Sequence, residues 1–487
     1  MLIAECPLCG GRERCYGFLV GEERFDTCTH CGLLSHHAPE GEEPSEQGAS
    51  PKDPDEEGFA GALLARLDGY VGGGDRRLGV LGDAGARFLE EARRRGFEPR
   101  VLAGDAPAAP EHGVLVVMYQ LEDALDPVGY ARALRAHLRP GGVAALVTRQ
   151  LVKPDWHAEV TRVLERHQRY SFSDANLETV LWKAGFREVL LSHRASGRPN
   201  PGWSRDQVFA LARMAEPRAR PRLSVVLPVY NEARTVGQVL DALVAKEMPG
   251  LDLEIIVVES ASTDGSREIV ERYRNRGPVR LVLEDRPRGK GFAVRTGLRY
   301  ATGDVILIQD ADLEYDLLDY ELLVNPILLG RAAFVLGTRH NGTWKIRRFA
   351  QNRLATLMNV AHFGLLALMN HLYRQSMTDP FTMFKVFRSD CLFGLEFECN
   401  RFDFDIELVC KLLRKGYVPL EIPVNYQSRS FDEGKKVRIF RDPPTWIRAM
   451  FKYRLGPVVK LPPAGRPVVL PGEGEDRALP FPAPPKS

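Results

Sequence analysis

VILIQDADLEYD, residues 305–316, is an apolar run of β-forming residues that passes directly into carboxylates. Two similar runs precede it, LSVVLPVYNE at 223–232 and LEIIVVES at 253–260, and each ends in polar residues before a helix-length segment. Strands that alternate with helices form parallel sheets, and open sheets of this kind bind ligands at the carboxyl ends of their strands. The sequence therefore predicts an α/β domain with a polar site along one edge of its sheet.

Length and charge restrict the class of protein. The chain of 487 residues has the apolar and charged fractions of a globular protein, 44% and 27%, and is long enough for several domains. A net charge of +2 provides no global field for nucleic acid, so we expect no nucleic-acid partner. The N-terminal segment lacks the features of a signal peptide, and no run approaches ~18 apolar residues, so we expect a cytoplasmic protein.

Composition divides the chain into five segments. Paired cysteines occupy residues 1–38, and an acidic linker rich in Pro, Gly and Ser follows at 39–57. Apolar runs alternate with helical patterns at 58–215, which predicts a first α/β domain, and the larger α/β domain covers 222–455. Residues 456–487 are so rich in proline that we expect a disordered tail.

Two C-x-x-C pairs lie near the N-terminus: Cys6, Cys9, Cys28 and Cys31. Their spacing suits a tetrahedral zinc site with four thiolates, and Gly10 and Gly32 after the pairs permit the turns that such a site needs. Because four thiolates complete the coordination, the predicted zinc is structural. The alternative is two pairs of ordinary cysteines, whereas a redox pair is expected beside a βαβ unit, which this segment lacks.

Residues 58–213 resemble class I methyltransferases that follow a zinc-binding segment and act on nucleotide-linked sugars. The resemblance is carried by LGVLGDAGARFLEEARRRGFEP, YQLEDALDP, LRAHLRPGGVAALVTR and RYSFSDANLETVLWKAGFREV. It implies a Rossmann-like domain in which the turn at 81–85 approaches S-adenosylmethionine and an acid after the second strand binds the ribose. The acid nearest to that position is Asp105.

The interval GDAPAAPEHG, residues 104–113, changes this expectation. A parallel crossover needs a dozen or more residues, so these ten cannot supply the usual helix and third strand. We therefore expect a degenerate domain that serves as a scaffold or docking module and does not bind S-adenosylmethionine. The alternative is a bifunctional protein whose N-terminal half is an active methyltransferase.

The ordered motifs LPVYNE, VVESASTDGS and DAD make residues 222–452 resemble the family 2 glycosyltransferases. Within that family they are most similar to the dolichyl-phosphate and other polyprenyl-phosphate mannose and glucose synthases. The resemblance implies a GT-A fold and a nucleotide diphosphate sugar as donor. Ser260 and Ala261 replace the second acid and the glycine of the common VDDGSTDG pattern.

The same resemblance implies roles for individual residues. Contacts to the base and ribose are implied for Pro228, Tyr230, Glu232 and Glu259. Contacts to Mg²⁺ or Mn²⁺ and to the diphosphate are implied for Asp310, Asp312 and Glu314. Independently of the family, two carboxylates one residue apart can both reach a hard divalent cation, which stabilises the charge of a leaving diphosphate.

Basic residues would complete such a site. Lys290 precedes a predicted helix, whereas Arg429, Lys435 and Lys436 lie in a Gly-bearing segment that we interpret as a lid over the diphosphate or as a solvated loop. Two further acids are ambiguous. Asp264 is expected to cap a helix, and Glu407, inside a predicted helix, serves either the site or a salt bridge.

The acceptor site depends on two arginines and one acid. The resemblance implies that Arg339 and Arg347 hold the phosphate of a lipid acceptor, which a planar guanidinium suits. Asp379 matches the Asp of the family's D-P-T-S-G-F motif. It would act as a general base if the acceptor is a hydroxyl, or would orient the acceptor if this is a phosphate. The apolar segment 354–373 contains Asn and His, which predicts an interfacial or core helix rather than a membrane span.

Together these patterns predict a metal-dependent inverting transferase that moves a hexose from a nucleotide diphosphate sugar to a polyprenyl phosphate, with peripheral contact at the inner face of the membrane. One rival hypothesis keeps the chemistry but uses a saccharide or protein hydroxyl as acceptor. Another is a sugar-nucleotide sensor without catalysis.

Overall fold

The computed structural model describes residues 5–20, 23–31, 33–37, 59–71, 74–82, 84–102, 110–149, 170–191, 207–214, 218–340, 352–427 and 442–456. Several predicted features lie outside these residues: Arg347, Arg429, Lys435, Lys436, Asp105, Gly32 and the linker at 39–57. The chain divides into two compact units near Pro217. The first consists mainly of Met1–Pro217, and the second mainly of Arg218–Leu328 and Ala332–Lys460.

The four-cysteine segment of the first unit is part of a small antiparallel sheet. Its strands are β1 (Arg14–Val20), β2 (Glu23–Cys28), β3 (Leu34–His37) and β8 (Tyr170–Ser171), in that order. Strand β8 comes from the following α/β segment and pairs with β3, where Leu34 faces Ser171 and Ser35 faces Tyr170. The N-terminal ribbon therefore shares a sheet with residues that are distant in sequence.

A six-stranded sheet forms the rest of this unit, in the order β5-β4-β6-β7-β10-β9. Its strands are β4 (Arg77–Leu81), β5 (Glu98–Val101), β6 (His112–Met118), β7 (Leu138–Arg149), β9 (Phe186–Leu191) and β10 (Gln207–Met214). Its helices are α1 (Phe59–Val71), α2 (Gly85–Arg94), α3 (Pro127–Leu134), the 3₁₀ helix η1 (Arg135–His137) and α5 (Asp174–Lys183). In the described part of this sheet β5 is the edge strand, and the next strand along the chain, β6, pairs on the other side of β4.

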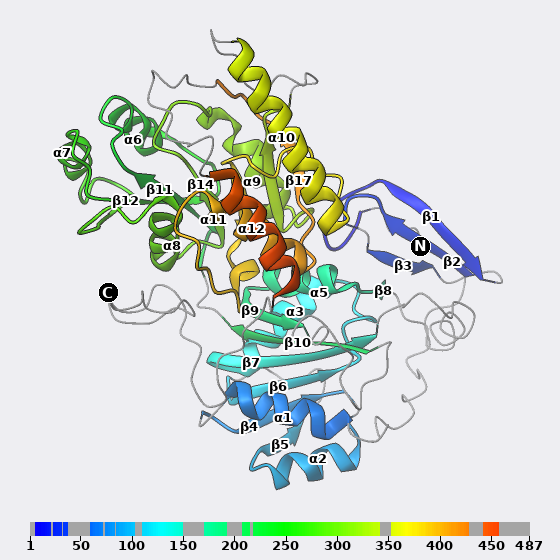
Figure 1. Ribbon diagram of the computed structural model, residues 1–487. Helices are drawn as coiled ribbons and strands as arrows, with labels where there is room; N and C mark the ends of the chain where they lie inside the picture. The colour runs from blue at the N-terminus through cyan, green and yellow to red at the C-terminus, as the bar shows by residue number, and fades with distance from the viewer. Residues whose placement is uncertain are drawn as a thin grey trace. The chain divides into compact units, whose positions relative to one another are not determined.

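The second unit is built on a seven-stranded sheet, in the order β13-β12-β11-β14-β16-β15-β17 (Figure 1). Its strands are β11 (Arg222–Val229), β12 (Asp252–Glu259), β13 (Val279–Leu283), β14 (Val305–Ile308), β15 (Phe334–Thr338), β16 (Lys385–Arg388) and β17 (Leu420–Pro423). Its helices are α6 (Val236–Ala245), α7 (Ser266–Glu271), α8 (Lys290–Tyr300), η2 (Leu317–Asp319), α9 (Tyr320–Leu328), α10 (Asn352–Tyr373), η3 (Ser389–Leu392), α11 (Asp403–Arg414) and α12 (Asp442–Leu455). The predicted α/β class is confirmed, although the antiparallel strand β16 was not anticipated.

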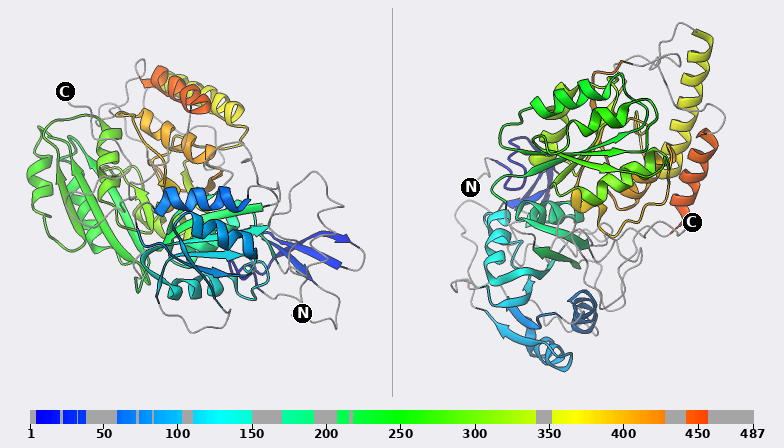
Figure 2. Two further views of the ribbon diagram at one scale, coloured as in Figure 1. Left: turned by 90° about the horizontal axis from the view of Figure 1, so that it is seen from below. Right: turned by 90° about the vertical axis from the view of Figure 1, so that its left-hand side faces the viewer.

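The path of the chain places helices on both faces of this sheet. The crossover from β11 through α6 to β12 and the one from β13 through α8 to β14 run in opposite directions across the sheet. Since parallel crossovers are right-handed, α6 and α8 lie on opposite faces, as Figures 1 and 2 show. Strand β11 is buried on both faces, which explains its nearly continuous apolar sequence.

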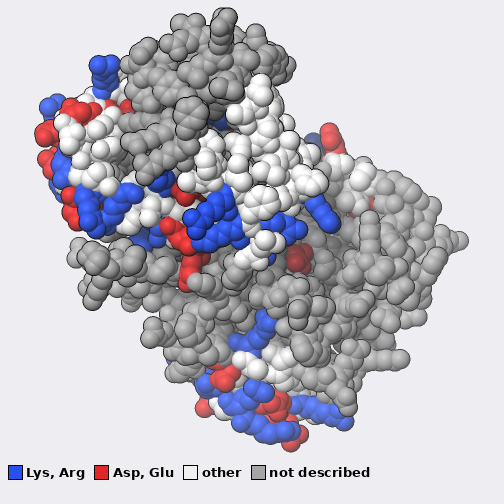
Figure 3. Space-filling view, viewed as in Figure 1, with Lys and Arg blue, Asp and Glu red and all other residues white. Residues whose placement is uncertain are grey.

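Helix α10 corresponds to the ambiguous apolar segment. Asn359, His362, Leu365 and Met369 form a buried face, whereas Val360 is exposed, so this helix packs in the domain along one side. Among the described residues, no helix combines the length and apolar character needed to cross a membrane. On the face of the second unit shown in Figure 3, Lys and Arg side chains are interspersed with Asp and Glu.

The approach of α8 to β11 requires a glycine. A Cβ atom on Gly297 would overlap Cγ1 of Val226, which is fully buried in the central strand. Because Lys290 is the first residue of α8, this contact also fixes the position of a predicted site residue.

We expect Gly297→Val to destabilise the protein by about 2 kcal/mol, because inserted volume in a packed core forces side chains and backbone to move. Denaturant unfolding of the full chain measures the change. Gly364→Val is the matched control, since a Cβ at Gly364 in α10 meets nothing within 4 Å. Adding Val226→Ala to Gly297→Val should restore part of the lost stability, because it makes room for the new side chain. Equal stability of Gly297→Val and Gly364→Val would contradict the packing argument.

Candidate functional site

The candidate site lies where the strand order reverses. Strand β11 pairs in parallel with β12 on one side and with β14 on the other, so their carboxyl ends meet at one edge. Pro228 is the second-to-last residue of β11, and Tyr230, which follows the strand, has 39% of its surface exposed. Asp310 and Asp312 follow β14. Such switch points are the usual ligand sites of open α/β sheets.

The loops after β11 and β12 are joined by hydrogen bonds. Asn231 N donates to Ser262 Oγ (2.9 Å), and Thr263 N donates back to Asn231 Oδ1 (2.9 Å). Glu232 N donates to Ser266 Oγ at 2.8 Å. The polar residues of STDGS therefore hold the LPVYNE loop, and the two loops form one rigid edge.

Asp264 takes part in the same contact. The N-cap of α7 is Gly265 rather than Asp264, but Asp264 Oδ1 accepts a hydrogen bond from Ser266 N (3.0 Å), the first residue of the helix. Its Oδ2 accepts another from Ala233 N (3.0 Å) in the neighbouring loop. The role of Asp264 is therefore structural.

Backbone conformation at this edge is unusual. Asn231 and Ala261 have φ values of +50° and +52°, in the left-handed region that favours glycine. Ala261 stands where the common motif has glycine, so this chain keeps the conformation without the residue that favours it. Strained residues of this kind are held by their surroundings and gather at functional sites.

Glu259, the last residue of β12, does not face the open edge directly. Its side chain is fully buried. Its Oε1 accepts from Ser262 N (2.6 Å), and its Oε2 accepts from Arg267 Nε. Sequence reasoning missed Arg267, because a single basic residue after STDGS does not reveal the direction in which its side chain turns.

The acidic residues after β14 each have a different partner. Lys290 Nζ lies 2.7 Å from Asp310 Oδ1, and the carboxylates around Lys290 raise its pKa although burial opposes its charge. Asp312 accepts from Glu314 N (3.1 Å) and is buried. Glu314 accepts from the hydroxyl of Tyr426 at 3.0 Å.

Among the described residues, the only group of three or more ligand atoms close enough to share an ion is the four-cysteine group. The oxygens of Asp310, Asp312 and Glu314 therefore do not converge as a ready-made three-carboxylate site. Magnesium commonly takes one or two carboxylates together with phosphate oxygens and water, so Asp310 and Asp312 fit a cation that binds with a diphosphate.

Arg339 and Asp379 form a bidentate ion pair. Arg339 Nε and Nη2 donate to the two carboxylate oxygens at 2.7 and 2.8 Å, and Arg339 N donates to Oδ2 at 3.0 Å. Burial raises the pKa of Asp379, but Arg339 outweighs it and holds the pKa at about 2. Asp379 is therefore an ionised partner of Arg339 at neutral pH, and a weak proton acceptor.

Glu407 belongs to a structural ion pair. It accepts hydrogen bonds from Glu398 N (3.1 Å) and Cys399 N (2.8 Å), and it pairs with Lys411 one helical turn along α11. Of the two roles considered for Glu407, the structure shows the salt bridge.

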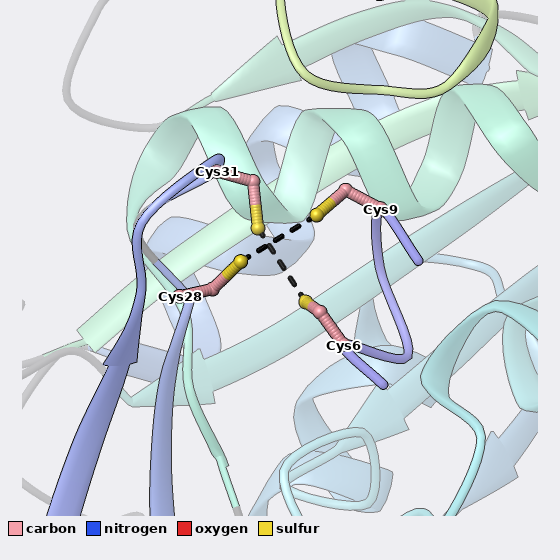
Figure 4. Close-up of side chains that lie close together, drawn as sticks. All are labelled: Cys6, Cys9, Cys28 and Cys31. Carbon is pink, nitrogen blue, oxygen red and sulfur yellow. Dashed lines mark hydrogen bonds between the residues drawn. The ribbon is translucent and has the colours of Figure 1, made fainter. Parts of the chain in front are cut away.

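The four cysteines converge in the first unit (Figure 4). The sulfur atoms of Cys6 and Cys31 lie 3.6 Å apart, and those of Cys9 and Cys28 lie 3.5 Å apart. A tetrahedral zinc ion with Zn–S bonds of ~2.3 Å requires sulfur atoms about 3.8 Å apart, so the group fits zinc closely. The hydrogen bond with Cys31 lowers the pKa of Cys6 to about 5.

Helix α5 supports both cysteine knuckles. Asn176 Nδ2 donates to the carbonyl of Cys31 (2.8 Å), and Lys183 Nζ donates to the carbonyl of Leu8 (2.6 Å). A capping box formed by Ser173 and Asn176 begins the helix. The cysteine group is thus fixed to the α/β part of the first unit.

The Arg339–Asp379 pair gives a prediction about stability and pH. We expect Asp379→Asn to destabilise the protein by about 3 kcal/mol at pH 7, because it leaves a buried guanidinium without its counter-ion. The folded pKa of Asp379 lies below its unfolded value of about 3.9, so the contribution is complete above pH ~4 and is lost as the pH falls toward 2.

Denaturant unfolding of both proteins between pH 2 and pH 7 tests this expectation, and the difference between them should shrink in the acid range. Asp285→Asn is the control, because Asp285 forms an exposed pair with Arg288 and its loss should change stability by less than about 0.5 kcal/mol. A difference that is constant with pH would show that the charge of Asp379 does not stabilise the fold.

Residues 224–393 match the family described as Glycosyl transferase family 2. Dolichol-phosphate mannosyltransferase of Pyrococcus furiosus is 26% identical over 214 residues, which cover 44% of this chain and 59% of that protein. Dolichyl-phosphate beta-glucosyltransferase of Trichomonas vaginalis is 35% identical over 125 residues, which cover 23% of this chain and 37% of that protein. The chain thus spans less than two thirds of the length of either relative.

Among solved structures, glucosyl-3-phosphoglycerate synthase from Mycobacterium tuberculosis, in complex with Mn²⁺, UDP-glucose and phosphoglyceric acid, aligns with 48% of this chain and 80% of its own. The sequence identity is 21% and the TM-score is 0.37. The family match itself begins in β11, includes Asp310 and Asp312, and extends past Asp379. Residues 224–393 therefore form a family 2 glycosyltransferase domain.

Proposed function

We propose that the chain is a metal-dependent inverting glycosyltransferase of GT-A fold that transfers a hexose from a nucleotide diphosphate sugar to a polyprenyl phosphate. The observation that carries this proposal is the position of Asp310 and Asp312 after β14, at the reversal of strand order, with Lys290 bound to Asp310. Carboxylates and an ammonium group at such an edge suit a metal ion and a diphosphate.

In this reaction the chain's residues hold the donor and neutralise the charge that develops on its diphosphate. Asp310 and Asp312 would hold Mg²⁺ or Mn²⁺, which when bound supplies Lewis-acid stabilisation of the leaving group. Lys290 keeps Asp310 in place and offers a cation beside the diphosphate. Pro228, Tyr230 and Glu232 form the rigid edge on which the nucleoside would rest, and direct displacement at the anomeric carbon would invert it.

The state of Asp379 favours a phosphate acceptor over a hydroxyl acceptor. A hydroxyl needs a general base, but Asp379 is buried, bound to Arg339 and has a pKa of about 2. A phosphate monoester is already largely ionised near neutral pH, with a second pKa near ~6, and needs a cation that positions it. Arg339 is that cation, and the membrane-bound acceptor implies peripheral contact of the enzyme with a membrane surface.

The first unit serves this proposal as a scaffold rather than as a second enzyme. Its Gly-rich turn is explained by packing, because a Cβ on Gly82 would overlap the carbonyl oxygen of Met118 at the end of β6. Strand β5 is the edge of the described sheet, on the side where a third strand would complete a cofactor pocket. We therefore propose that it binds structural zinc and no S-adenosylmethionine.

A transfer assay with the full chain tests the main proposal. We expect UDP- or GDP-hexose, Mn²⁺ and a short polyprenyl phosphate to give a glycolipid, and Asp312→Asn to lower its rate by roughly 10²-fold or more, because the leaving charge loses its stabilisation. Asp316→Asn is the matched control, since Asp316 caps η2 in the same loop and asparagine preserves the cap.

The outcomes of this assay separate the rival functions. A water-soluble glycosylated product without glycolipid would move the acceptor to a hydroxyl. Absence of turnover with every donor, or full activity of Asp312→Asn, would contradict the proposed transferase and favour a sensor.

Zinc binding gives a second prediction. We expect about one zinc ion per chain in protein purified under reducing conditions, and we expect Cys28→Ser to lose the zinc and lower the unfolding temperature, since a structural zinc site contributes directly to folding. Cys15→Ser is the control, because Cys15 is exposed on β1 and outside the group. Elemental analysis and thermal unfolding measure both effects, and a fully stable protein without bound metal would overturn the assignment.

A further inference from the structure

Arg267 lies across the ends of two strands at the edge of the glycosyltransferase domain. Its Nε donates to Glu259 Oε2 at the end of β12, and its Nη2 donates to the carbonyl of Glu284 (2.6 Å), just after β13. Glu259 and Leu283 are paired in the sheet, so the guanidinium spans adjacent strand ends. This is the edge at which the nucleoside of the proposed donor would lie.

The carboxylates of this edge are turned inward. Glu259 is fully buried, and Ser262 N occupies its second oxygen. Glu284 is also buried, with its oxygens bound by the hydroxyls of Ser260 (2.8 Å) and Thr296 (3.1 Å). Because both side chains are buried and hydrogen-bonded within the protein, neither acid is well placed to accept a hydrogen bond from an amino or imino group of a base.

Arg267 is the group that covers Glu259 on the outside. Its side chain keeps 31% of its surface exposed. Nε and Nη2 each make one bond to the protein, while Nη1 makes none to the described residues. A guanidinium has five N–H donors and no acceptor, so Arg267 offers donors only, in an orientation fixed by Glu259 and the Glu284 carbonyl.

We propose that Arg267 selects the base of the donor nucleotide by donating a hydrogen bond to the C4 carbonyl oxygen of uracil or the C6 carbonyl oxygen of guanine, with Glu259 as its positioning residue. This inference rests on the proposed function, since it assumes a nucleotide diphosphate sugar as donor. Adenine and cytosine carry an amino group where guanine and uracil carry a carbonyl, and an amino group facing Arg267 would place donor against donor. An unpaired donor at a buried contact weakens binding, so these bases are disfavoured.

The competing explanation is that Arg267 only ties α7 to the sheet. The two roles differ in what they do to ligand preference. If Arg267 has only a structural role, its substitution should weaken the binding of all ligands of the site equally. If it contacts the base, the substitution should change the ratio of the affinities for different nucleotides and leave the affinity for pyrophosphate unchanged.

Calorimetric titration of the full chain with UDP, GDP, ADP, CDP and inorganic pyrophosphate, each with Mn²⁺, tests the proposal. We expect wild type to bind UDP or GDP at least tenfold more tightly than ADP and CDP, as a single well-placed base contact provides. We expect Arg267→Lys to reduce this preference to less than about threefold and to leave pyrophosphate binding unchanged, because lysine keeps a cation beside Glu259 but lacks the planar fork. The UDP and GDP titrations also distinguish uracil from guanine.

Arg272→Lys is the matched control, because Arg272 follows α7 and is exposed. A wild-type preference that persists in Arg267→Lys would overturn the proposal, and so would an equal loss of affinity for every ligand, pyrophosphate included. If Arg267→Lys fails to fold, Glu259→Gln provides the second test. It keeps the side-chain shape but weakens the hold on Arg267, so the preference should fall in that variant as well.

Failure of wild type to bind any nucleotide with Mn²⁺ would overturn the proposed donor itself, and the inference with it. That result is distinct from nucleotide binding without base preference, which would overturn only the role of Arg267.

Discussion

The parallel pairing of β11 with both β12 and β14 is the constraint on which the rest of the second unit depends. It brings the carboxyl ends of three strands to one edge and sends the connecting helices to opposite faces. The close approach of α8 at Gly297 then places Lys290 beside Asp310, and hydrogen bonds join the loop that carries Tyr230 to the loop after β12. Residues far apart in the sequence thus become one site because of strand order.

Ion pairing organises the acids within that site. Asp310 is held by Lys290, Glu259 by Arg267, and the third acid, Asp379, by Arg339. A buried carboxylate without a counter-ion is costly, so these cationic partners stabilise the acids and hold them in place. The same pairing explains why Asp379 is a weak base, and hence why the proposed acceptor is one that needs no deprotonation.

Local patterns predicted the α/β class, the four-cysteine group and the carboxylates after β14, because each depends on short-range sequence signals. The partners of the acids were not predictable in this way. Tyr426, which binds Glu314, lies more than a hundred residues away, and the direction of Arg267 depends on a buried glutamate at the end of another strand. Strand β16 was missed because KVFR is short and charged, and the pairing of β3 with β8 joins segments that composition had separated.

The arginines and the lysine of the site differ in the number and direction of the hydrogen bonds that they form. Arg267 and Arg339 each use Nε and Nη2 for protein oxygens, and their Nη1 groups make no hydrogen bond to the described residues. A guanidinium can do this because its five donors lie in one rigid plane, so that binding an acid on one side orients the other side. Lysine has three donors on a flexible stem, which suits Lys290 beside a diphosphate, where charge matters more than direction. On this view, the proposed reaction uses arginine where a substrate group must be oriented and lysine where charge must be neutralised.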